Sequence, residues 1–152
     1  MMILLRSVLL FVLLLVVALP VPARAAAADH ARLYIPRLSM DAPIDECALV
    51  DRDYVIGDGV CHLEGTATIE HDWARMVLAG HSPGVFANLV YLEVGDQVMV
   101  WDAGAVEVYR VVLITVTTID DTRWLMPTDT ETLTLITCAG DARLIIHAER
   151  ES

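Results

Sequence analysis

Residues 134–149 read TLITCAGDARLIIHAE, which carries the clearest structural signal in the chain. Two runs rich in leucine, isoleucine and threonine lie on either side of a short Ala-Gly-Asp turn, a pattern typical of a β-hairpin. The hairpin would place Cys138 at the end of its first strand and Arg143 at the start of its second. The sequence therefore predicts a thiol and a guanidinium facing each other across a tight turn. Taken alone, this pair is equally compatible with a purely structural hairpin.

Other short runs of alternating apolar and polar residues predict further strands upstream. They are Arg32–Pro36, Met40–Ile44, Arg75–Gly80, Gln97–Trp101 and Val106–Val116. The segment 45–59 reads as an acidic, turn-rich loop, and the apolar spacing in 86–92 fits a short helical turn. The strands, without any long amphipathic helix, predict an all-β fold. We expect a closed, antiparallel eight-stranded β-barrel with one or two short helical turns, because closure removes unpaired strand edges.

The N-terminus reads as a targeting segment. Residues 1–25 contain Arg6, then the apolar run 7–18, and end in small residues, as a secretory signal does. A cleaved signal peptide and an uncleaved N-terminal membrane anchor both fit this pattern. We expect a linker at 26–31 and a single domain at 32–152, delivered to an extracytoplasmic location, either secreted or held at the outer face of the membrane.

The charge of the chain excludes two classes of partner. The formal net charge is −11, and all ten basic residues are arginines. Nucleic acids and anionic lipid surfaces both require a positive patch, so neither is an expected partner. The absence of lysine also means that no lysine side chain of the chain could capture an acyl group.

The three cysteines raise the question of a disulfide. If two of them pair, Cys47 and Cys61 are the natural partners, each near the end of an early strand, and Cys138 is then a free thiol. The alternative is that both early cysteines are simply buried thiols. His62 follows Cys61, but no spacing typical of a zinc site accompanies it, so no metal site is predicted.

A cysteine that acts as a nucleophile requires a general base, and His81 is the best candidate. It follows the strongly apolar run Arg75–Gly80 and precedes Ser-Pro-Gly, a turn that would hold the imidazole at the mouth of a barrel. An ordinary loop histidine is the alternative. His147 shares a strand face with Arg143 by the period of two, and we interpret it as a structural or supporting group.

At this point the motifs resemble a known family. Thr134–Cys138 matches the T-L-x-T-C signature of sortases, the extracytoplasmic cysteine transpeptidases of bacteria. The run Leu78–Ser82 resembles the histidine segment of sortases, and Arg143–Ala148 resembles their arginine strand. The similarity covers roughly residues 33–149 and is nearest to compact sortases outside the best-known housekeeping class. The family fold is an eight-stranded barrel, which agrees with the strand count.

The resemblance implies a role for each residue of the site. Cys138 would be the nucleophile, His81 the general acid and base, and Arg143 the donor that steadies the oxyanion. Neighbouring residues that we expect to contact substrate are Thr137, Ser82 and Phe86. The implied partners are exported proteins with an LPxTG-like sorting signal near the C-terminus, and an amine acceptor such as a cell-wall peptide or a pilin lysine. The alternatives are a thiol peptidase that uses water and a non-catalytic peptide-binding module.

Two acidic features of the chain need to be considered beside the sortase resemblance. The loop residues Asp120, Asp121, Asp129 and Glu131 could bind calcium, although a solvated acidic loop explains them equally well, and no cofactor is predicted. Asp141 could pair with Arg143 or could simply form the turn, which we favour. The turn 139–142 is short and leaves little space for a specificity loop.

Overall fold

The computed structural model describes residues 30–51, 53–69 and 74–152. The predicted signal segment and most of the predicted linker lie outside the described residues. Among the residues that are described, no helix has the length and apolar character needed to cross a membrane.

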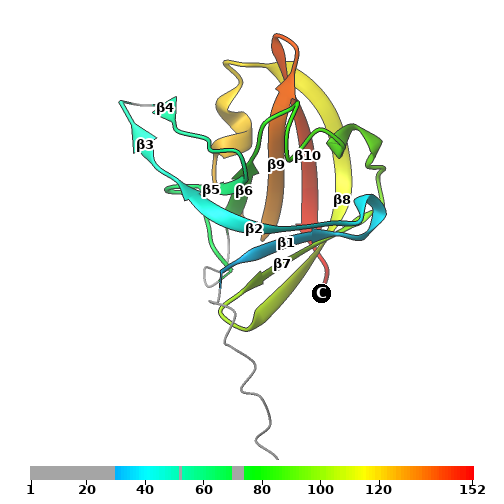
Figure 1. Ribbon diagram of the computed structural model, residues 1–152. Coiled ribbons are helices and arrows are strands. Elements are labelled where there is room, and N and C mark those ends of the chain that lie inside the picture. Colours follow the sequence, from blue (N-terminus) through cyan, green and yellow to red (C-terminus); the bar gives the residue numbers. More distant parts are fainter. Residues whose placement is uncertain (1–29, 52, 70–73) are drawn as a thin grey trace, which may run out of the picture.

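Eight strands close into a barrel, and a two-stranded sheet projects from it (Figure 1). The barrel strands are β1 (Arg32–Ile35), β2 (Met40–Cys47), β5 (Val60–Leu63), β6 (Arg75–Ala79), β7 (Gln97–Asp102), β8 (Ala105–Thr118), β9 (Thr132–Ala139) and β10 (Ala142–Arg150). The small sheet pairs β3 (Leu49–Val50) with β4 (Asp53–Tyr54), and the 3-10 turns are η1 (Pro36–Leu38), η2 (Leu89–Tyr91) and η3 (Thr122–Leu125). The predicted all-β, closed eight-stranded barrel is confirmed.

The order of strands around the barrel is β1-β2-β5-β6-β9-β10-β8-β7. Six of the neighbouring pairs are antiparallel, but β2 pairs with β5 and β6 pairs with β9 in parallel. The prediction of a wholly antiparallel barrel is therefore wrong. Short turns join antiparallel neighbours, whereas the parallel pairs require the long connections 48–59 and 80–131.

The barrel strands present two different faces. The interior core includes Met76, Leu78, Leu133 and Leu135, which alternate with residues of the opposite face. On the opposite face lies a smaller group that we call the outer-face cluster. Its buried members are Cys47, Cys61, Leu63, Val77 and Ala79, with Tyr54, Ile56, Leu125 and Ile136 packed against them. The segment around β3 and β4 and the turn η3 therefore cover this outer face.

A disulfide bond joins Cys47 to Cys61, with 5.3 Å between their Cα atoms. The sequence left this pairing open. Cys47 ends β2 and Cys61 lies in the neighbouring β5, so the bridge closes the base of the connection that carries β3 and β4. A bridge that closes a loop of this length stabilises a fold by about 3 kcal/mol in the chain-entropy model. Cys138 is the free cysteine.

Candidate active site

Three adjacent strands bring His81, Cys138 and Arg143 to one end of the barrel. In the parallel pair of β6 and β9, Ala79 lies beside Ile136, and the Gly80 N–H donates to the Ile136 carbonyl at 3.3 Å. Continuing that register by two residues places His81 beside Cys138. In the antiparallel pair of β9 and β10, Cys138 lies directly opposite Arg143. The barrel topology therefore assembles the three residues in the order histidine, cysteine, arginine.

Cys138 and Arg143 are in direct contact, as the hairpin pattern predicted. Arg143 Nη1 donates a hydrogen bond to Cys138 Sγ at 3.0 Å, and both side chains are half-buried. A guanidinium is permanently charged, and a charged donor makes a stronger hydrogen bond than a neutral one. The same donor lies close to where a carbonyl oxygen would become negative after attack by Sγ.

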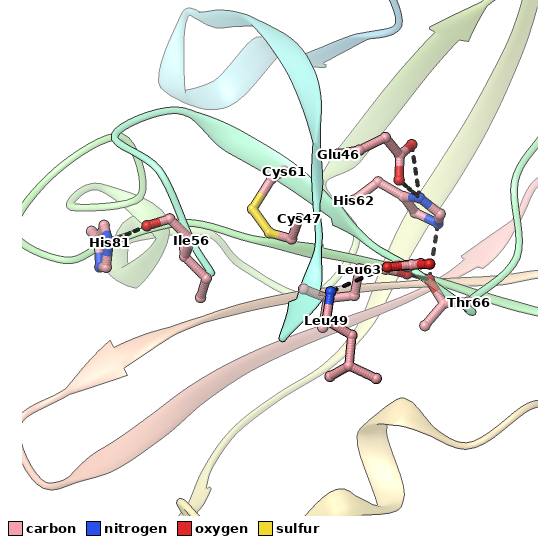
Figure 2. The surroundings of a disulfide bond; sticks show 10 residues. Glu46, Cys47, Leu49, Ile56, Cys61, His62, Leu63, Thr66 and His81 are labelled. Atoms are coloured by element: carbon pink, nitrogen blue, oxygen red, sulfur yellow. Dashed lines mark hydrogen bonds and ion pairs between the residues drawn. A yellow bond between two sulfur atoms is a disulfide. The ribbon is translucent and has the colours of Figure 1, made fainter. Parts of the chain in front are cut away.

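The imidazole of His81 is held by a main-chain carbonyl. Its Nε2 lies 3.2 Å from the carbonyl oxygen of Ile56, which follows β4 (Figure 2). A carbonyl only accepts hydrogen bonds, so Nε2 is the nitrogen that donates in this contact, in which Nδ1 takes no part. The His81 side chain is exposed, as a proton donor to an incoming peptide must be.

Two residues predicted to contact substrate lie beneath the site instead. Thr137 is buried on the interior side of β9, where its Oγ1 donates to the Gly80 carbonyl at 2.8 Å. Phe86 is fully buried in the interior core. The alternation of the strand turns Thr137 inward, and the loop after His81 folds back to fill the barrel, so contact of either residue with substrate stays a prediction. Ser82 is half-buried beside His81, and its contact with substrate stays a prediction.

The support beneath His81 leads to a prediction for Gly80. A Cβ added at Gly80 would lie 2.6 Å from Val85 Cγ1 and 2.9 Å from Phe86 Cδ2. The buried Phe86 ring cannot move aside freely, so we expect Gly80→Ala to reduce the free energy of unfolding by about 1–3 kcal/mol. Denaturant unfolding measures this. The matched control is Gly57→Ala, where an added Cβ meets no atom within 4 Å; equal stability of the two variants would contradict the prediction.

A buried polar group lies further along the same outer face, beneath η3. We call it the polar cluster: Arg75, Trp124, Thr134 and His147. The Trp124 ring lies 5.7 Å from the His147 ring and also 5.7 Å from Arg75 Cζ, and Thr134 is opposite His147 in the ladder. Each member has one buried side-chain N or O atom without a hydrogen-bond partner among the described residues. The sequence pattern indicated only His147 of these four residues, as a supporting group. The other three were missed, because Arg75 and Trp124 meet only in the folded chain.

The polar cluster makes stability sensitive to pH. Burial, and secondly the positive charge of Arg75, hold the pKa of His147 below its usual value, while Glu149 opposes this shift. As the pH falls below the ordinary histidine pKa, the unfolded chain binds a proton at His147 more readily than the folded chain does. The contribution of His147 to the free energy of unfolding is therefore present above that pKa and is lost as the pH falls below it.

We therefore expect His147→Phe, which keeps an aromatic ring against Trp124, to flatten the loss of stability between pH 7 and pH 5. The difference in slope is at most about 1.4 kcal/mol per pH unit, the limit for one proton. Thermal unfolding at several pH values measures this slope. A matched His30→Phe control, at an exposed position at the start of the described chain, should keep the wild-type slope. Parallel slopes for His147→Phe and the wild type would contradict the assignment.

Two of the four acidic loop residues, Asp121 and Glu131, pair with arginines. The Arg123 guanidinium, followed by the Thr117 hydroxyl, holds the pKa of Asp121 well below its usual value. Glu131 pairs with Arg150. Among the described residues, no three His, Cys, Asp or Glu side chains gather in a group that could hold a metal ion. Likewise, the ion pairs found among those residues do not include one between Asp141 and Arg143.

Comparison with known proteins gives a consistent family assignment. The family model described as "Sortase domain" matches residues 33–151. No curated protein sequence matches this chain significantly.

Several solved structures are similar to the chain. Sortase C-1 from Actinomyces oris is 31% identical, with a TM-score of 0.70 over 80% of this chain and 71% of that one. A lid mutant of sortase A from Corynebacterium diphtheriae is 28% identical, with a TM-score of 0.68 over 86% and 74%. A sortase D5 transpeptidase from Clostridium perfringens is 26% identical, with a TM-score of 0.71 over 82% and 79%. The similarity thus extends across several sortase classes.

Proposed function

The chain belongs to the sortase family, and from this premise we propose that it is a cysteine transpeptidase with Cys138, His81 and Arg143 as its catalytic residues. The observation that carries the proposal is the hydrogen bond from Arg143 Nη1 to Cys138 Sγ. A guanidinium on a free thiol, with an exposed imidazole on the next strand, supplies the nucleophile, the charge stabilisation and the proton donor that acyl transfer needs.

The first half of the proposed reaction cleaves a peptide bond. The Cys138 thiolate attacks the scissile carbonyl carbon, and Arg143 stabilises the resulting oxyanion. His81, as the imidazolium, gives its Nδ1 proton to the departing amine, so the C–N bond breaks and a thioester remains on Cys138. A cationic donor beside Sγ can stabilise first the thiolate and then the oxyanion. The negative charge moves only a short distance, from the sulfur to the oxygen of the carbonyl carbon that the sulfur attacks.

The second half transfers the acyl group to an amine. The neutral amine attacks the thioester carbonyl, His81 accepts its proton, and the Cys138 thiolate leaves as a new amide forms. The chain has no lysine, so a lysine acceptor must belong to another molecule. We propose that the acyl donor is an exported protein with an LPxTG-like signal near its C-terminus, and that the acceptor is a cell-wall peptide or a pilin lysine. The domain would then act outside the cytoplasm, delivered by its N-terminal segment.

Incubation of the protein with LPxTG-type peptides, followed by intact-mass spectrometry, tests this proposal. The expected result is a mass increase equal to the acyl fragment, localised to Cys138, with release of the C-terminal peptide fragment. An added amine should remove the adduct and form a new amide. Release by water alone would make the protein a thiol peptidase, and the absence of any adduct across a library of signal peptides would overturn the enzyme assignment.

A further inference from the structure

The connection between β2 and β5 reaches from the disulfide to the candidate active site. We call residues 48–59 the excursion; it contains β3 and β4, and Figure 1 shows it projecting beside the barrel. Its returning part carries the Ile56 carbonyl that binds His81 Nε2 at 3.2 Å. The catalytic imidazole is therefore oriented by a segment that is distant in sequence.

The disulfide lies at the base of the excursion, between β2 and β5, and β5 is the neighbour of β6, which ends two residues before His81. Cys61 pairs with Ala79, two residues before His81, and both sulfurs belong to the outer-face cluster. The Ile56 side chain packs against that cluster, and Figure 2 shows its carbonyl directed to the His81 ring. The bridge thus ties both ends of the excursion together and provides the surface on which Ile56 rests.

Besides the packing of Ile56 and Tyr54 against the outer-face cluster, the described part of the excursion is attached by hydrogen bonds. Leu49 N donates to Glu64 Oε2 at 3.1 Å, Tyr54 Oη donates to the Glu64 carbonyl at 2.9 Å, and Val55 N donates to the Ala48 carbonyl at 3.1 Å. All are near the base or within the excursion itself, and the two side-chain bonds are exposed. None of them holds the Ile56 carbonyl, so the position of this oxygen depends on the packing of Ile56 against the outer-face cluster, to which both sulfurs belong.

The barrel beneath the excursion is held independently of the bridge. On the other side of the disulfide in Figure 2, His62 Nδ1 bonds the Glu46 carboxylate at 3.0 Å and Nε2 bonds the Ala67 carbonyl at 2.9 Å. Thr66 Oγ1 accepts from Val77 N at 3.2 Å, which ties this group to β6. Removal of the two sulfurs should therefore loosen the excursion while the β2–β5–β6 pairing remains.

We propose that the Cys47–Cys61 disulfide is a positioning element for catalysis: it holds the Ile56 carbonyl against His81 Nε2, and so keeps Nδ1 as the nitrogen that exchanges the proton. The expected change in kcat rests on the proposed function, whereas the expected change in the His81 tautomer does not. A carbonyl acceptor at Nε2 also restricts rotation of the imidazole ring. Loss of this contact should affect the chemical step more than substrate binding.

The test is the double variant Cys47→Ala/Cys61→Ala, which leaves Cys138 as the single thiol. Ring ¹⁵N NMR of His81 should change from a predominant Nε2–H tautomer in the wild type to a mixture in the variant. The rate of Cys138 alkylation by iodoacetamide at neutral pH should fall, and kcat for a cleaved peptide should decrease about tenfold with KM within about twofold. The matched control is Val50→Ser, an exposed position on the excursion that should leave all three measurements at wild-type values.

The separate measurements distinguish failure of the proposed function from failure of the inference about the disulfide. If no peptide is cleaved by the wild type, the proposed function fails, while NMR and alkylation still decide the inference. If the double variant does not fold, Ile56→Ala with the disulfide intact removes the anchor of the carbonyl and should show the same changes. A wild-type His81 tautomer, alkylation rate and kcat in a folded variant that lacks the bridge, or in Ile56→Ala, would overturn the proposal.

Discussion

We expect Cys138→Ala to form no covalent adduct with a signal peptide and its turnover to fall by at least about 1000-fold. The reason is that the variant has no nucleophile, while Arg143 and His81 alone supply only charge and a proton. Cys138 is the free cysteine of the chain, so no second thiol can replace it while the bridge between Cys47 and Cys61 is intact. Intact-mass spectrometry after peptide incubation detects the adduct, and peptide cleavage measured by chromatography gives the rate.

The control for this prediction is a fold measurement on the same protein. Cys138 is half-buried near the end of β9, and its contact with Arg143 is one hydrogen bond, so Cys138→Ala should retain the barrel and unfold at nearly the wild-type temperature. An adduct that persists in the folded Cys138→Ala variant would show that another group is acylated. Turnover near the wild-type level would exclude Cys138 as the nucleophile.

The hairpin and the overall barrel were predictable because their signals are local. The runs around the 139–142 turn are long, rich in β-branched residues and joined by a short connection, so the register of Cys138 opposite Arg143 follows from the sequence alone. Seven of the eight barrel strands also followed from local runs. By contrast, β5 (Val60–Leu63) was hidden in the sequence, because all four of its residues are buried and it shows no alternation.

The missed features all depend on contacts between segments that are distant in sequence. The parallel pair of β6 and β9 brings His81 to Cys138 across a long connection, and the sequence placed His81 only by its turn. The contact of His81 with Ile56 involves a main-chain carbonyl, which has no residue-type signature at all. The burial of Thr137 and Phe86 was missed for a related reason: both were named for their proximity in sequence to Cys138 and His81, whereas the fold turns both inward.

Arg143→Met should reduce the rate of thioester formation by about 100–1000-fold, with most of the loss in kcat. Methionine has nearly the length of arginine but neither charge nor donor, so the variant loses the hydrogen bond to Cys138 Sγ and the donor for the oxyanion. Arg143→Lys should recover little of this rate, because an ammonium group lacks the planar fork of a guanidinium. Rapid-quench measurement of the first turnover separates this step from transfer to the amine.

Arg150→Met is the matched control, since Arg150 lies at the far end of the same strand β10 and pairs with Glu131 away from the site. It should change the first turnover within about twofold, because Arg150 is far from Cys138 along β10. Its stability should fall, because Arg150 also pairs with the buried Glu107 at 3.5 Å and removal of one partner of a buried pair is destabilising. The comparison separates the effect of a cation beside the Cys138 thiol from the effect of an arginine on the stability of β10. If Arg143→Met forms the thioester as fast as Arg150→Met, the charge on Arg143 stabilises neither thiolate nor oxyanion, and the contact with Cys138 is structural.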